Sequence, residues 1–173
     1  MLRKFNRAVL LVLAATTSTI SLASAGPGAV VERFVGTWRL MSIEDRLSDG
    51  TVVPATDFGT APIGYLIYDT TGHMAAQIMR SDRPHFASAT EEGGTPDEMK
   101  AAFLGYAAYF GTYTVHEKEG FVVHRVEGGL FPNYVGQDLK RFFTLSDGRL
   151  VLQPPPFQIG GKEVTRRLTW RRV

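Results

Sequence analysis

The sequence contains no cysteine, so the folded chain can form no disulfide and use no cysteine as a nucleophile, thiolate ligand or lipid attachment point. Stability must therefore come from packing. The chain also lacks several enzyme motifs: the G-x-S-x-G elbow of hydrolases, the H-E-x-x-H metal helix, the P-loop and the dinucleotide-binding fingerprint. These absences leave no common catalytic arrangement that can be recognised from local sequence.

Metal-binding patterns are also missing. The four histidines lie far apart, and none is spaced from another as a local metal pair would be: His73, His85, His116 and His124. We therefore predict no metal site and no cofactor.

A large excess of charge of one sign is absent as well. Of the 19 basic residues, Arg3, Lys4 and Arg7 lie near the N-terminus, and removing them leaves 16 basic against 17 acidic residues. The remaining chain is almost neutral, although the whole sequence has a pI near 9.0. A nearly neutral domain has little attraction for polyanions, so we predict no nucleic-acid partner.

The N-terminal segment has the three parts of a secretory signal. Basic residues at 3–7 precede an apolar run at 8–15, and residues 23–25 read Ala-Ser-Ala, an A-x-A cleavage site. The alternative is a membrane anchor, but the apolar run is shorter than the ~20 residues that span a bilayer. We predict a cleaved signal peptide over 1–25, a mature domain over 26–173, and no stable membrane insertion after cleavage. No adjacent arginine pair precedes the apolar run, so we expect the general secretory route to the periplasm or the exterior.

The rest of the chain shows short β-type segments separated by Gly- and Asp-containing turns. Eight strands are predicted, at 36–44, 64–68, 73–79, 109–116, 121–127, 139–145, 149–153 and 163–172. Most neighbours along the chain are joined by hairpin-like turns. This pattern is typical of an all-β fold, an eight-stranded antiparallel up-and-down barrel, which holds packed side chains or one small ligand.

One segment, 80–108, interrupts the strands. It is polar and loop-like at first, and then Thr95-Pro96-Asp97-Glu98 carries the signals of a helix start. We predict one short helix here, which acts either as a lid over the barrel mouth or as a plug for one barrel end.

The two ends of the barrel pattern resemble the lipocalin and wider calycin signature. Gly36-Thr37-Trp38 opens the first strand and an arginine, Arg172, ends the last. The resemblance implies that Trp38 closes the barrel floor and that Arg172 packs over its ring. Further segments resemble the bacterial lipocalin-like domain family over residues 35–173: 64–68, 72–74, 77–80, 109–113, 124–128 and 131–136. This family implies a barrel that binds a small ligand, and it implies no particular catalytic residue.

Strand alternation selects candidate residues for the barrel interior. Val122, His124 and Val126 share the more apolar face of their strand, so His124 is predicted to point inward. It is either a core histidine bonded to a backbone carbonyl or a tyrosine, or a ligand contact and candidate catalytic base.

Two arginines also share faces with apolar residues. Because an unpaired buried charge is costly, Arg141 and Arg166 would grip the carboxylate of a ligand, be turned to solvent by a local bulge, or be neutralised inside the protein by Glu44 or another acid. Tyr65, Gln77 and Tyr113 complete the predicted ligand contacts, although the turn type of the hairpin at Asp69 decides whether Tyr65 or Tyr68 faces inward.

The expected function is binding of a small, mostly apolar ligand in the barrel. Two alternatives remain at this point. One is a small barrel enzyme of the isomerase, cyclase or dehydratase type that uses His124 with a tyrosine. The other is a structural domain with a filled interior.

Overall fold

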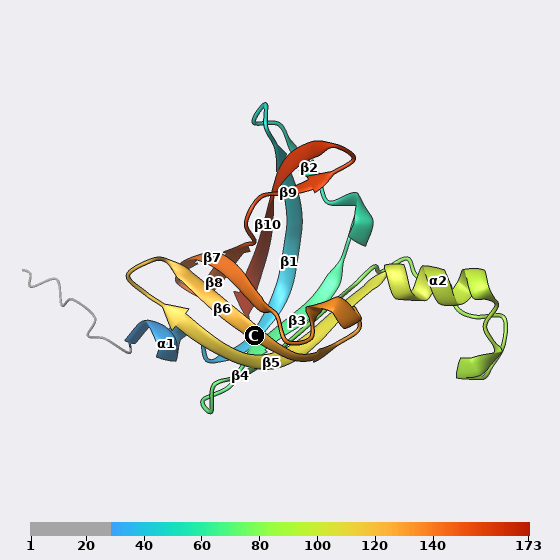
Figure 1. Ribbon diagram of the computed structural model, residues 1–173, viewed down its shortest axis with the longest axis horizontal. Helices are drawn as coiled ribbons and strands as arrows, with labels where there is room; N and C mark the ends of the chain where they lie inside the picture. The colour runs from blue at the N-terminus through green and yellow to red at the C-terminus, as the bar shows by residue number, and fades with distance from the viewer. Residues whose placement is uncertain (1–28) are drawn as a thin grey trace, which may run out of the picture.

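A computed structural model describes residues 29–173 of the protein (Figure 1). The predicted signal peptide, 1–25, lies outside these residues. Ten strands and two α-helices make up the regular structure: α1 (Ala29–Phe34), β1 (Gly36–Leu47), β2 (Val52–Pro54), β3 (Ile63–Tyr68), β4 (His73–Met79), α2 (Pro96–Leu104), β5 (Tyr106–His116), β6 (Phe121–Gly129), β7 (Asp138–Ser146), β8 (Arg149–Gln153), β9 (Phe157–Ile159) and β10 (Lys162–Arg172). Three short 3-10 turns lie at Thr56–Phe58, Glu91–Gly93 and Pro132–Tyr134.

Eight of the strands form a closed barrel. Each pairs antiparallel with its neighbour in the order β1-β3-β4-β5-β6-β7-β8-β10, and β10 pairs back with β1. Closure leaves no free sheet edge among these eight strands. The predicted fold class, an eight-stranded antiparallel barrel with a short helical insertion, is confirmed.

The first and last barrel strands are longer than the barrel wall needs. Beyond their pairing with β3 and β8, β1 and β10 continue together and are flanked by β2 and β9. The resulting four-stranded flap, β2-β1-β10-β9, rises beside the barrel mouth (Figure 1). The sequence did not predict β2 and β9, which are only three residues long.

One end of the barrel is closed by Trp38 and the helix α1. Trp38 is fully buried and its indole N–H donates to the carbonyl of Phe34 at 2.8 Å, while the Arg172 guanidinium lies 4.3 Å from the Trp38 ring centre. Arg172 also donates to the carbonyls of Arg33 and Val35. Gly36 has a positive φ of 136°, and a Cβ there would collide with the Arg172 guanidinium. The glycine of the G-x-W pattern therefore makes room for the arginine.

The insertion forms the predicted helix but takes neither predicted position. α2 begins with a capping box between Thr95 and Glu98, and Pro96 is its first residue. No residue of α2 is buried, and the helix extends away from the barrel on an arm between β4 and β5 (Figure 1). It covers no mouth and plugs no end, because its few apolar residues face solvent. Met99, Phe103 and Leu104 are exposed.

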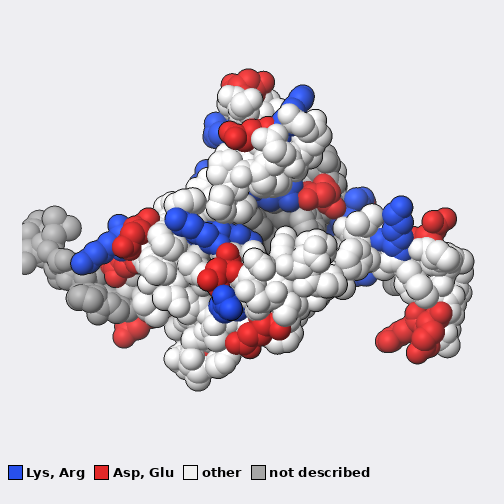
Figure 2. Space-filling view, viewed as in Figure 1, with Lys and Arg blue, Asp and Glu red and all other residues white. Residues whose placement is uncertain are grey.

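The face drawn in Figure 2 carries charges of both signs in an interspersed pattern, and acidic atoms gather at the tip of the arm. In residues 29–173, no helix is long and apolar enough to cross a bilayer.

Candidate functional site

The barrel interior and its mouth line a partly open pocket of about 510 Å³. Small-molecule sites commonly measure about 300–1,000 Å³, so the pocket has room for one small ligand. Inward-facing residues of β3, β4, β8 and β10 form part of its apolar wall: Leu66, Ala76, Ile78, Leu152, Leu168 and Trp170. A barrel with a completely filled interior is not what the structure describes.

Alternation along each strand determines which side chains reach this interior. On β6, Val122, His124 and Val126 are almost completely buried, as predicted from their shared face. On β3, Leu66 and Tyr68 are inward, and on β4, Ala76 and Ile78 are inward. The pairing of β3 with β4 places these two sets side by side on the same wall.

A row of three polar rings crosses the interior. The Tyr68 hydroxyl lies 2.7 Å from Nε2 of His124, and the Tyr109 hydroxyl lies 3.0 Å from Nδ1 of the same ring. Tyr68 and His124 are 1% and 0% exposed, whereas Tyr109 is partly accessible and lines the pocket. Both ring nitrogens of the histidine are therefore occupied by tyrosine hydroxyls.

Burial shifts the proton affinity of all three groups. Desolvation, helped by the positive charge of Arg141, lowers the pKa of His124 to about 3. Desolvation raises the pKa of Tyr68 well above its usual value and raises the pKa of Tyr109, against the opposing charge of Arg141. At neutral pH the row is uncharged, and a histidine with this pKa is a weak base. This arrangement fits the core-histidine alternative better than the catalytic one.

Arg141 of β7 lines the pocket close to this row. Its Nη1 donates to the carbonyl of Lys140 at 2.9 Å, and it takes part in none of the ion pairs found within residues 29–173. A partly buried guanidinium without a counter-ion attracts acceptor oxygens with negative charge.

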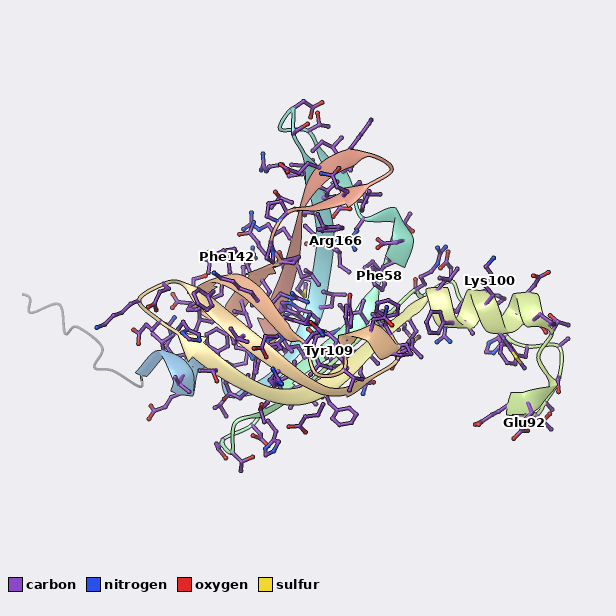
Figure 3. All side chains as sticks on the ribbon, in the orientation of Figure 1. Phe58, Glu92, Lys100, Tyr109, Phe142 and Arg166 are labelled. Carbon is purple, nitrogen blue, oxygen red and sulfur yellow. The ribbon has the colours of Figure 1, made fainter. Side chains whose placement is uncertain are left out.

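Arg166 of β10 lies at the mouth and is neutralised internally. It forms a bidentate pair with buried Asp45, at 2.8 Å for both contacts, and it also contacts Asp57 at 2.7 and 3.0 Å. Burial alone would lower the pKa of Arg166, but the hydrogen bonds and charges of the two carboxylates raise it above its ordinary value. Phe58 and Phe157 flank its guanidinium, and Figure 3 shows Phe58 and Arg166 near each other above Tyr109. The neutralising acids are Asp45 and Asp57 rather than Glu44.

Three other predicted contacts lie outside the pocket. Tyr65 is 49% exposed and faces outward, as does Gln77, which accepts a hydrogen bond from the Tyr106 hydroxyl at 2.8 Å. The structure therefore corrects their expected place in the interior: the β3–β4 register turns Tyr68 inward and Tyr65 outward. Tyr113 also points inward, but its hydroxyl donates to the carbonyl of Asp69 in the β3–β4 turn. Its polar end therefore stabilises this turn and does not line the pocket.

Sequence reasoning missed Tyr109, although a signal was present. Tyr109 and Tyr113 lie four residues apart on one strand and therefore share a face. An inward position for one tyrosine implies an inward position for the other. Asp45 and Asp57 had no such signal, because their contact with Arg166 bridges more than 100 residues of sequence.

Within the described part of the chain, no three His, Asp or Glu side chains gather as a metal site would require. The donor side chains that line the pocket include the hydroxyls of Tyr109 and Tyr134 and the guanidiniums of Arg141 and Arg166, which are suited to holding an organic ligand by its oxygen atoms.

Comparison with known proteins adds three findings. Residues 35–173 match the family profile described as "Lipocalin-like domain". A curated protein of Aspergillus oryzae, named 4'-hydroxy-3'-methoxypropiophenone carrier protein, is 32% identical over 107 residues, which cover 58% of this chain and 96% of the relative. The crystal structure of a lipocalin-like protein from Bacteroides uniformis aligns with a TM-score of 0.41 and 14% identity, over 82% of this chain and 99% of that chain.

Proposed function

Because the chain belongs to the lipocalin-like domain family, we propose that it is an exported carrier that holds one small, mostly apolar aromatic molecule in its barrel pocket. The observation that carries the proposal is the pocket itself. It is enclosed by the barrel wall, has apolar sides, and holds a small number of polar groups that would fix the orientation of a ligand.

The relative from Aspergillus oryzae supports the choice of an aromatic ligand. The molecule in the name of that carrier is an aryl ketone, with an apolar ring and chain and a few oxygen atoms. A molecule of this kind suits a pocket of about 510 Å³ with a tryptophan and a tyrosine in its wall.

The test is a binding measurement on the mature protein with a variant that fills the pocket. Ala76 lines the pocket, and the neighbouring Ala75 faces outward on the same strand. We expect wild-type protein and Ala75→Phe to bind members of a panel of aryl ketones, fatty acids and retinoids in isothermal titration calorimetry. We expect Ala76→Phe to lose that binding, because the added ring occupies the ligand volume.

Thermal melts of both variants show whether the fold is kept, and Ala107→Phe, another pocket-lining position, replaces Ala76→Phe if that variant does not fold. Binding that survives both filling variants, or no binding of any panel member by the wild type, would overturn the proposal.

Export is tested separately by expressing the full chain in a Gram-negative host. We expect protein from the periplasm or the medium to begin at Gly26 by intact mass, and Ala25→Arg to block this processing because the cleavage site needs small residues. Recovery of the unprocessed chain from the cytoplasm would contradict export and leave the carrier proposal standing.

A further inference from the structure

The row Tyr68–His124–Tyr109 has one proton more than it has internal hydrogen bonds. Each hydroxyl carries one hydrogen, and a neutral imidazole carries one N–H. Two contacts join the three groups, at Nε2 and at Nδ1 of His124. Two of the three hydrogens are used in these contacts, and the third must point elsewhere.

Only two arrangements satisfy both contacts. In one, Tyr68 donates to Nε2 and Nδ1–H donates to Tyr109, which leaves the Tyr109 hydroxyl hydrogen free. In the other, Tyr109 donates to Nδ1 and Nε2–H donates to Tyr68, which leaves the Tyr68 hydrogen free.

Burial selects between these arrangements. Tyr68 is 1% exposed, and its hydroxyl has no second hydrogen-bond partner among the described residues. A donor left unsatisfied at that depth is costly. Tyr109 lines the pocket, where a ligand or water can accept its hydrogen. The first arrangement therefore holds, with His124 protonated on Nδ1.

Arg141 adds a second donor on the same side. It lines the same pocket and forms no ion pair within residues 29–173, unlike Arg166, which Asp45 and Asp57 neutralise. The pocket thus presents the Tyr109 hydroxyl hydrogen and the uncompensated positive charge of Arg141 in a wall that is mainly apolar. The wall also contains the Tyr134 hydroxyl and the Arg166–Asp57 pair. Both attract the same kind of group, an oxygen that accepts hydrogen bonds.

We propose that Tyr109 and Arg141 anchor an acceptor oxygen of the bound molecule, and that Tyr68 and His124 act as positioning residues that force the Tyr109 hydroxyl to donate. This inference rests on the proposed carrier function and deepens it. The ligand class is an aromatic molecule whose ring lies in the apolar part of the pocket and whose carbonyl or anionic oxygen meets the two donors.

The experiment compares ligands of one shape with and without that oxygen. Propiophenone and propylbenzene differ by the carbonyl oxygen, and 4-propylbenzoate carries an anionic acceptor. We expect wild-type protein to bind propiophenone about tenfold more tightly than propylbenzene, since a hydrogen bond made in a buried site is worth about that factor. Comparing 4-propylbenzoate with propiophenone shows whether a charged or a neutral oxygen is preferred, and either preference fits the anchor.

Tyr109→Phe removes the donor and keeps the ring. We expect it to reduce the preference for propiophenone by about threefold, because Arg141 still contacts the carbonyl oxygen, and to leave the affinity for propylbenzene almost unchanged. The matched control is Tyr106→Phe on the same strand, whose hydroxyl donates to Gln77 on the outer face, and it should keep the wild-type preference.

Two spectroscopic readouts test the hydrogen positions directly. The carbonyl stretch of propiophenone should move to lower frequency when the ligand binds wild-type protein. This shift should be smaller in Tyr109→Phe and in Arg141→Gln, because each variant lacks one donor. Nitrogen-15 NMR should find the His124 proton on Nδ1, and Tyr68→Phe should weaken the carbonyl shift because the histidine is then free to change tautomer.

Equal affinity of the wild type for propiophenone and propylbenzene, or a His124 proton on Nε2, would overturn this anchor while leaving the carrier function intact. Failure of the wild type to bind these three probes or any member of the wider panel would instead overturn the carrier function.

Discussion

The buried histidine makes a specific prediction about stability in mild acid. His124 has a pKa of about 3 in the folded protein, against an ordinary value of 6.5 that applies to the unfolded chain. Between these two values the unfolded chain binds a proton at this position and the folded chain does not. Stability is therefore unaffected above about pH 6.5 and falls as the pH drops below it.

The size of the effect follows from the same two pKa values. Each pH unit below 6.5 costs about 1.4 kcal/mol, so lowering the pH from about 7.5 to about 5 should cost about 2 kcal/mol. Carboxylates whose pKa is lowered in the fold, such as Asp69, add their loss mainly below this range, because they ionise near pH 4 in the unfolded chain.

The assay is urea unfolding of the mature protein at a series of pH values, with the free energy of unfolding taken by linear extrapolation. The variant His124→Gln removes the titrating group. We expect it to be less stable than wild type at neutral pH, because its contacts with Tyr68 and Tyr109 are altered, but to lose much less stability on acidification.

A wild-type free energy that stays constant from about pH 7.5 to about pH 5, or an equal slope in His124→Gln, would refute this reasoning. Should His124→Gln fail to fold, NMR of the wild-type protein decides the matter: the ring signals of His124 should not titrate above about pH 5.

Two further predictions concern the closed end and the mouth. Arg172→Ala should lower the free energy of unfolding by about 1–3 kcal/mol, since the contact with the Trp38 ring and the backbone hydrogen bonds are lost, whereas Arg171→Ala, on the opposite face of β10, should change it by less than about 0.5 kcal/mol. Asp45→Asn should cost about 3 kcal/mol because it removes the buried partner of Arg166, and Asp138→Asn, in an exposed pair, should cost less than about 1 kcal/mol. Denaturant unfolding measures the free energy of unfolding of all four variants. Similar losses of stability for Arg172→Ala and Arg171→Ala, or for Asp45→Asn and Asp138→Asn, would contradict the stabilising role given to Arg172 or to Asp45.

Local patterns were sufficient to predict most of the barrel. The eight predicted strands match the eight barrel strands to within three residues at each end, because hairpin turns such as Asp69–Gly72 and Ser146–Gly148 mark where strands end. The sequence did not predict three short elements, which have too few residues to show a repeating pattern: α1 has six residues, and β2 and β9 have three each. Such elements form because tertiary contacts stabilise them, as the burial of Phe34 against Tyr68 and Phe143 shows.

The site was only partly predictable. The inward position of His124 followed from the alternation of apolar residues on β6, which is a property of one strand. The choice between Tyr65 and Tyr68 depended on the pairing of β3 with β4, because a shift of one residue exchanges the two faces.

The sequence by itself determined that the chain forms a barrel, where its strands begin and end, and which face of β6 is apolar, because these depend on interactions between near neighbours. Only the tertiary structure decided which charges are neutralised and which are left to line the pocket. Arg141 and Arg166 look alike in sequence, yet closure of the barrel brings two acids to Arg166, while Arg141 remains in the pocket without an ion-pair partner among residues 29–173. Such pairings depend on how distant strands meet, which no local pattern encodes.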